Sequence, residues 1–259
     1  MRRLMVAEPV ARAAIWSRRL AIFAFAIAMI AIALSRMRAA DPPAALSVFA
    51  AGLVIAMLAA MLAGSAAVVI WRDGLRGAGQ ALFGFALAAA LIAYPGYLGV
   101  EAFVLPPIND VSTDLASPPG FLISTKARAA RVGAEPPPSS EETRAAQRGA
   151  YPDIETIRVE MDSTEAYRVA LSAASDLGWR IIDAEPPNLA GDGAALIEAV
   201  DRSLFFGFFS DIAIRIRPGA VDTAIDVRSV SRVGKHDFGA NGRHVRRFLE
   251  AVQTEARGR

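Results

Sequence analysis

Residues 108–114 concentrate oxygen-bearing side chains in the sequence Ile-Asn-Asp-Val-Ser-Thr-Asp, with carboxylates at Asp110 and Asp114. Oxygen ligands of this kind can bind a hard cation such as calcium. The spacing matches no calcium-binding loop, however, and Asn, Asp, Ser and Thr also hydrogen-bond to nearby backbone groups and so build tight loops. We therefore expect a structural loop here and no bound metal.

A second polar segment, residues 228–243, begins with Arg-Ser-Val-Ser-Arg and continues into a glycine-rich stretch. Side chains alternate between the two faces of a β-strand, so Arg228 and Arg232 share one face and the two serines share the other. Paired guanidinium groups suit carboxylates or an anionic ligand. We predict that these two arginines lie close to Asp110 and Asp114 and so join the two polar segments.

A nucleophile with an adjacent base is the alternative chemistry. Ser231, His236 and Asp237 supply the residue types of a hydrolase, with Asp110 and Asp114 as further acids. Triad members normally converge from separate elements, whereas the first three lie within seven positions of one another. The chain has no cysteine, which excludes thiolate catalysis and cysteine-ligated metals, and two histidines alone do not indicate a metal centre. We predict a protein that is not an enzyme and has no cofactor, with a membrane-anchored periplasmic hydrolase as the alternative.

The two segments together supply a candidate polar cluster, whose role is either binding or structural. The 28 basic and 26 acidic side chains of the chain nearly balance. No dense basic stripe with interleaved aromatic residues is present, so nucleic-acid binding is not indicated. The candidate residues are Asn109, Asp110, Ser112, Thr113, Asp114, Arg228, Ser229, Ser231, Arg232, Asp237 and Asn241.

The part of the chain that precedes these segments is almost wholly apolar. Three runs, at about residues 20–37, 44–70 and 81–104, have the length and composition of membrane-spanning helices, which need roughly 20 apolar residues. No small-x-small cleavage site follows the first run, so we predict an uncleaved anchor rather than a signal peptide. Asp, Glu, Lys and His are missing from the middle of all three runs, which argues against a transporter or channel.

Arginines near the ends of the runs indicate the orientation, because Lys and Arg stay on the cytoplasmic side of a membrane. Seven of them lie before the first run or in the second turn, against two in the first turn. We predict a multi-pass protein of the bacterial inner membrane with residues 1–19 in the cytoplasm and the C-terminal domain in the periplasm. The seven are Arg2, Arg3, Arg12, Arg18, Arg19, Arg72 and Arg76, and the two are Arg36 and Arg38.

The second run contains a ladder of small residues at intervals of four, Gly52, Ala56, Ala60 and Gly64. Small side chains in one line allow two helix backbones to approach closely. The ladder predicts packing among the three spans, and a homodimer face is the alternative.

The remaining chain divides into a linker and a domain. Residues 105–150 hold the first polar segment and a proline-rich stretch, in which a short surface helix at 141–148 is an option. Residues 151–259 show the periodicity of an α+β domain. The pattern predicts strands at 156–161, 179–184, 194–202, 211–217 and 224–232, a helix from the capping box at Asp162 to Gly178, and a closing helix at 241–254.

Residues 204–209, Leu-Phe-Phe-Gly-Phe-Phe, lie between the predicted third and fourth strands. Four phenylalanines around a glycine most often belong to the edge of the core. In a domain tethered to a membrane, the alternative is that they contact lipid or close an apolar pocket.

The order strand, helix, four strands, helix is satisfied by an antiparallel sheet with helices on one face. It resembles the helix-grip or TBP-like architecture, an analogy of fold alone. The motifs resemble those of the bacterial and chloroplast domain-of-unknown-function family fourteen ninety-nine over residues 106–254. The matching segments are 109–114 with Pro118, Pro119 and Phe121; Tyr151-Pro152; Gly178-Trp179; 206–211; and 228–241, from Arg228 to Asn241. The family often has two acidic residues where this chain has Ser210-Asp211.

This resemblance implies a domain of the cell envelope and no particular activity. We predict a membrane-anchored periplasmic domain that binds a small lipidic or anionic ligand, or a protein partner in the envelope.

Overall fold

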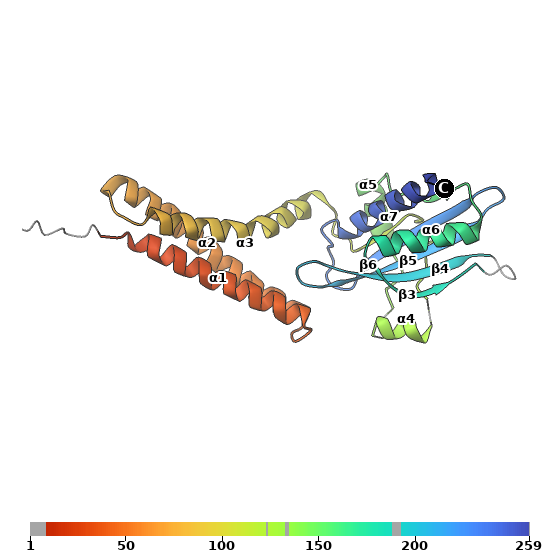
Figure 1. Cartoon of the computed structure of the whole chain (residues 1–259), viewed down its shortest axis with the longest axis horizontal. Helices are drawn as coiled ribbons and strands as arrows, with labels where there is room; N and C mark the ends of the chain where they lie inside the picture. The colour runs from red at the N-terminus through yellow and green to blue at the C-terminus, as the bar shows by residue number, and fades with distance from the viewer. Residues whose placement is uncertain (1–8, 123, 133–134, 188–192, 259) are drawn as a thin grey trace, which may run out of the picture. The chain divides into compact units, whose positions relative to one another are not determined.

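The apolar runs form three long helices in the computed structural model, which describes residues 9–122, 124–132, 135–187 and 193–258. These are α1 (Arg12–Arg36), α2 (Pro42–Asp73) and α3 (Ala78–Val104), and each is long and apolar enough to cross a membrane. The chain divides into two compact units, one that ends at Val100 and one that begins at Glu101. Figure 1 shows the three helices and the sheet domain.

Small side chains fill the interior of the helical unit, and large apolar side chains point outward, as expected where lipid rather than water surrounds the helices. A Cβ atom on Gly84 of α3 would collide with the Ser17 side chain of α1, so this helix contact depends on glycine. The buried positions are Ala14, Ser17, Ala21, Ala24, Ala28 and Ala31 of α1, Ala45, Gly52, Ala56, Ala59, Ala63 and Ala66 of α2, and Ala81, Gly84 and Ala88 of α3.

The predicted ladder of four small residues does not form a single face. Gly52 and Ala56 are buried, and a Cβ on Gly52 would lie 3.3 Å from Cγ2 of Ile27 in α1. Gly64 is exposed, and a Cβ on this residue would meet no atom within 4 Å. Four residues turn an α-helix by roughly 400°, so an i+4 line rotates about 40° at each step and leaves the interface. Ala60 is partly buried and packs against the core between the helices. Packing between the spans therefore accounts for the ladder as far as Ala60 but not for Gly64.

The start of α1 lies beside the turn that joins α2 to α3. The backbone N–H of Ala11 donates to the carbonyl of Arg76 at 2.9 Å, and the N–H of Arg76 donates to the carbonyl of Pro9 at 3.2 Å. The arginines before the first span and those of the second turn therefore lie at the same end of the helical unit. Arg2 and Arg3, which belong to the same predicted group, lie outside the described residues.

The second unit is built on one antiparallel sheet, in the order β1-β6-β5-β4-β3, with β2 also paired to β6. In the described part of this unit, the helices α4 to α7 accompany the sheet (Figure 1). The strands are β1 (Asp110–Ser112), β2 (Ile157–Val159), β3 (Arg180–Glu185), β4 (Ala195–Arg202), β5 (Phe209–Pro218) and β6 (Thr223–Ser231), and the helices are α4 (Thr125–Ala130), α5 (Glu141–Ala150), α6 (Ser163–Asp176) and α7 (Ala240–Arg257).

The segment that was predicted to be a loop contains strand β1. Asp110, Val111 and Ser112 pair with Val230, Ser229 and Arg228 of β6, and β2 pairs with the other half of the same strand. An uncovered strand edge leaves backbone N–H and C=O groups without partners, and β1 and β2 supply partners to β6. The tertiary position of the segment therefore overrides its local preference for a turn.

Helices α6 and α7 pack on one face of the sheet, over the apolar core. Ile212 and Ile214 of β5 meet Val169 of α6 and Phe248 of α7 in this core. The carboxylate of Asp162 caps α6 by accepting from the N–H groups of Thr164 and Glu165 at 2.8 and 2.9 Å, as the capping motif predicts.

The expectation that helices cover one face only is wrong. Helix α4 lies on the opposite face, where Ala127 packs with Ile182 of β3 and Val200 of β4. Its sequence, Thr-Lys-Ala-Arg-Ala-Ala, is too short and polar to show an apolar period. The contact that holds it in place comes from residues distant in the chain.

Candidate functional site

The polar residues singled out in the sequence lie on both faces of the sheet, so they do not form one cluster. On the face that α4 covers, Arg228 donates from Nε and Nη2 to the two carboxylate oxygens of Asp110 at 2.9 and 2.8 Å. Both side chains are buried. The predicted pair of Asp110 and Arg228 is confirmed.

Asp114 and Arg232, the other members of the predicted group, do not pair with each other and have different partners. Asp114 accepts from Arg215 and Arg217 of β5 at 2.9 and 3.3 Å. Arg232 donates to Asp211 at 2.8 and 2.6 Å. Asp114 lies beyond the end of β1, where the chain passes over the sheet toward β5, so its position follows from the sheet register and not from its spacing to Asp110.

Asp226 joins these groups into a larger network. Its side chain accepts from Thr156 at 2.6 Å, from Arg215 at 3.0 Å and from Arg217 at 2.7 Å. Burial raises the pKa of Asp226, but the hydrogen bonds from Thr156 and Arg215 outweigh it, so the pKa lies below its ordinary value. Thr113 also contacts this carboxylate, at 3.3 Å.

A fully buried ion pair that the sequence did not indicate joins Arg131 to Glu198 of β4. Arg131 also donates to the carbonyl of Leu122 at 2.7 Å, and Glu198 accepts from the N–H of Leu122 at 2.9 Å. Burial raises the pKa of Glu198 although Arg131 opposes this effect. The pair therefore fastens Leu122 and the segment 124–131 to the sheet. Arg131 follows an alanine-rich segment and lies 67 positions from its partner, so no local signal could have identified it.

On the other face, Asn241 at the start of α7 connects the two polar segments. Its Nδ2 donates to the carbonyl of Asn109 and to Oγ of Ser231, both at 2.9 Å. Asp237 accepts from the N–H of Gly239 and of Asn241 at 2.8 Å each, which caps this end of α7. Burial raises the pKa of Asp237.

Ser229, His244 and Asp201 form a hydrogen-bond chain that the sequence did not suggest. Ser229 Oγ lies 3.1 Å from His244 Nδ1, and His244 Nε2 lies 3.1 Å from Asp201. The hydrogen bond from His244 lowers the pKa of Asp201. Ser229 Oγ donates its one hydrogen to Asn241 Oδ1 at 2.7 Å, so this hydrogen is not directed at His244.

This arrangement differs from a catalytic triad, in which the base accepts the proton of the nucleophile. Ser229 is also completely buried. The residues of the alternative hydrolase prediction do not assemble either. His236 Nδ1 accepts from the N–H of Phe238 at 3.0 Å, Ser231 bonds to Asn241, and Asp237 caps α7.

The remaining candidates have structural contacts. Ser112 exchanges two hydrogen bonds with Gln147 of α5, at 3.0 and 2.6 Å. The side chain of Asn109 donates to the carbonyl of Gly234 at 2.7 Å. Within the described ranges, no group of three or more His, Asp or Glu side chains is arranged to hold a metal ion.

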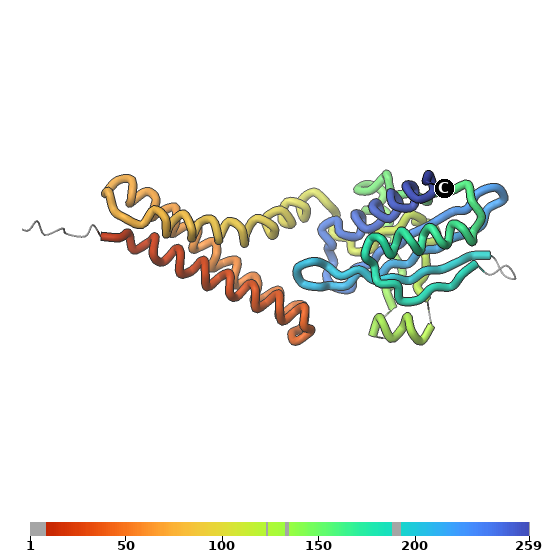
Figure 2. The backbone as a smooth tube through the Cα atoms, viewed as in Figure 1, coloured from red at the N-terminus to blue at the C-terminus, as the bar shows by residue number. Residues whose placement is uncertain are grey.

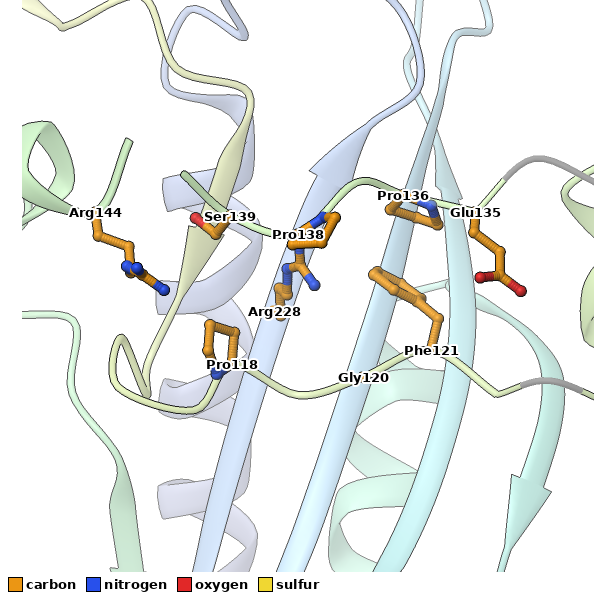
Figure 3. Close-up of a pocket in the computed structure, with 9 residues that line it drawn as sticks. All are labelled: Pro118, Gly120, Phe121, Glu135, Pro136, Pro138, Ser139, Arg144 and Arg228. Atoms are coloured by element: carbon orange, nitrogen blue, oxygen red, sulfur yellow. The ribbon is translucent and has the colours of Figure 1, made fainter. Parts of the chain in front are cut away.

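A pocket of about 260 Å³ opens on the face where Asp110 and Arg228 pair. The ring of Phe121 lies 5.4 Å from the Arg228 guanidinium carbon. Figure 3 shows Arg144 at one end of the pocket and Glu135 at the other, with Arg228 between them. The remaining lining residues are Pro118, Gly120, Pro136, Pro138 and Ser139.

Three apolar helices followed by an antiparallel sheet domain define a protein with candidate membrane spans and one α+β domain. A family model described as "Protein of unknown function (DUF1499)" matches residues 110–252, from β1 to α7, and the chain belongs to this family. A search of curated proteins found no match.

Proposed function

We propose that this chain is a non-enzymatic inner-membrane protein whose C-terminal domain binds a small anionic ligand in the Arg228 pocket. The observation that carries the proposal is that the guanidinium groups of Arg228 and Arg144 and the ring of Phe121 line one cavity. Arg228 donates from Nε and Nη2 to Asp110, and from Nη2 also to the carbonyl of Pro137. The two N–H donors of Nη1 are then available to a phosphate or carboxylate.

The two ends of the pocket differ in charge. Arg144 is positive and Glu135 is negative, and Phe121 lies between them (Figure 3). An aromatic face and a carboxylate together attract an amino group. A small zwitterion with a phosphate at one end and an amine at the other, the chemistry of phosphoethanolamine, matches this arrangement better than a simple anion. We also propose that the domain has a helix-grip architecture. The ligand would then lie on the face of the sheet opposite α6 and α7.

Arg144→Ala is expected to weaken the binding of phosphoethanolamine about 10- to 100-fold, because a charge-assisted hydrogen bond contributes roughly 1.5–3 kcal/mol. Calorimetric titration of the full chain in detergent measures the dissociation constant. Arg148→Ala is the matched control, since Arg148 lies on the same helix and pairs with the same Glu141 but does not line the pocket. It is expected to bind as the wild type does.

Glu135→Gln tests whether the pocket recognises the amino group of the ligand as well as its phosphate. It is expected to reduce the preference for phosphoethanolamine over inorganic phosphate and to leave phosphate binding unchanged. Equal affinities of Arg144→Ala and Arg148→Ala, or no measurable binding of either compound, would contradict the proposal. A protein partner in the cell envelope is the alternative occupant of this face.

We also propose that the N-terminus is cytoplasmic and the domain periplasmic, which the clustering of arginines at one end of the helical unit supports. The chain has no cysteine, so single cysteines can report the side of the membrane. In intact bacterial cells, a membrane-impermeant maleimide is expected to label Val221→Cys but not Asp73→Cys, which requires permeabilisation. The reverse pattern would invert the topology. A dimer through Gly52, Ala56, Ala60 and Gly64 stays a prediction, and the burial of Gly52 and Ala56 against neighbouring helices restricts it.

A further inference from the structure

The tip of the β4–β5 hairpin, residues 203–208, exposes apolar side chains on a hydrogen-bonded turn. Leu204 and Phe205 are 79% and 40% exposed. Phe206 and Phe208 stack with ring centroids 5.3 Å apart. The N–H of Ser203 donates to the carbonyl of Phe208 at 2.8 Å, and the N–H of Gly207 donates to that of Ser203 at 3.1 Å. The hairpin therefore presents its apolar tip in a fixed conformation.

This hairpin lies at the end of the domain where the chain arrives from the third helix. The N–H of Arg232 donates to the carbonyl of Phe209 at 3.0 Å, and the N–H of Ser231 donates to that of Asn109 at 2.9 Å. The N–H of Asp237 donates to the carbonyl of Ile108 at 3.0 Å. Figure 2 shows the β4–β5 turn and the loop after β6 at the same end of the sheet.

The length of the connection limits how far this end can lie from the third helix. Helix α3 ends at Val104, and Ile108 already contacts the domain. Four residues span at most about 14 Å when fully extended. If α3 crosses a bilayer, this end of the domain is held close to the lipid surface.

The charges around the hairpin suit an anionic surface. Arg202 and Lys235 are exposed, whereas the carboxylates of Asp211 and Asp237 at the same end are buried. Exposed basic residues next to a membrane are attracted to anionic headgroups. Apolar side chains flanked by basic ones are typical of segments that insert into the interfacial region of a bilayer.

We propose that the β4–β5 hairpin inserts Leu204 and Phe205 into the interfacial layer of the membrane, while Arg202 and Lys235 face anionic headgroups. This contact is a second attachment, in addition to the three helices, and it fixes the orientation of the domain. It is independent of ligand binding in the Arg228 pocket, which lies on the α4 face of the sheet.

The test uses the full chain in nanodiscs of phosphatidylglycerol and phosphatidylcholine. Because the chain has no cysteine, Leu204→Cys provides a single site for an environment-sensitive fluorophore. Val221→Cys is the matched control, since Val221 is also an apolar residue at a hairpin tip and is 91% exposed. The two tips lie at opposite ends of β5, whose 10 residues separate them by roughly 30 Å.

The fluorophore at position 204 is expected to show a blue-shifted emission and to be quenched by brominated lipids, and the fluorophore at position 221 is expected to show neither. Adding Phe205→Glu should reduce the quenching at position 204. A nanodisc of phosphatidylcholine alone should reduce it as well. Equal emission and equal quenching at both positions would overturn the proposal. A blue shift at position 204 without quenching by brominated lipid would also overturn it, because protein and not lipid would then cover the tip.

Discussion

Glu198→Gln is expected to lower the free energy of unfolding of the domain by about 3 kcal/mol, because it leaves the charge of Arg131 buried without a counter-ion. Both side chains are 1% exposed. Glu198 also accepts from the N–H of Leu122, so the substitution loosens the contact of Leu122 with the sheet. A surface pair would contribute far less, since exposed ion pairs typically stabilise by less than about 1 kcal/mol.

Denaturant unfolding of the full chain in detergent measures this loss. With Trp16→Phe and Trp71→Phe as background, Trp179 is the single fluorescent reporter, and it is buried against Phe248 at a ring distance of 5.7 Å. The expected result is a lower midpoint with an unchanged slope.

Two further variants identify the cause of the loss. Glu135→Gln removes an exposed partner of Arg128, at 3.9 Å, and is expected to change stability little. The double variant Arg131→Met and Glu198→Gln should recover much of the loss, because no unpaired charge remains in the interior. If Glu198→Gln unfolds at the wild-type midpoint, Arg131 is not buried in solution.

Asp226→Asn is expected to lower the free energy of unfolding by about 2–3 kcal/mol, because it leaves a buried network of charges unbalanced. Asp226 is completely buried and bonds to Arg215 and Arg217, which otherwise share only Asp114. Arg217 is half-exposed, so solvent screens part of the loss. Asp222→Asn is the control, since Asp222 pairs with the exposed Arg158, and its effect should stay below about 1 kcal/mol.

The same carboxylate makes stability depend on pH in a defined direction. The pKa of Asp226 in the folded domain lies below its ordinary value of 3.8, so in acid the unfolded chain binds more protons than the folded one. Its contribution is complete above pH 3.8 and is lost as the pH falls through the folded pKa. As the pH is lowered below 3.8, the midpoint of wild-type unfolding should therefore fall more steeply than that of Asp226→Asn. If the midpoints of the wild type and of Asp226→Asn change with pH in parallel, Asp226 does not cause this pH dependence.

Much of the fold could be predicted because its signals are local. The alternation of Ile212, Ile214 and Ile216 marks β5, and the stripe of Val245, Phe248 and Val252 marks α7; both sets are buried in the core. The same holds for the three long helices, since apolar length is a property of consecutive residues. The boundaries differ by a few residues, as with β2, which is three residues long where six were predicted.

The candidate site was predictable only where chemistry limited the choices. Asp110 and Arg228 pair as expected, although 118 positions separate them. Asp114 and Arg232 are of the same residue types as Asp110 and Arg228, but they pair with Arg215 and Asp211 instead. The strand register sets which side chains lie next to each other. The partners of Arg131 and of Ser229 carry no signal in the nearby sequence.

The sequence by itself determined the three apolar helices, the membership of the family and the order of elements from β2 to α7, since each depends on periodicity or on motifs within short segments. Only the tertiary structure decided that residues 110–112 form a strand, that α4 covers the second face of the sheet, and which carboxylate each arginine meets. The physical reason is that hydrogen bonds and ion pairs between distant residues depend on strand register and burial, and neither can be read from local spacing.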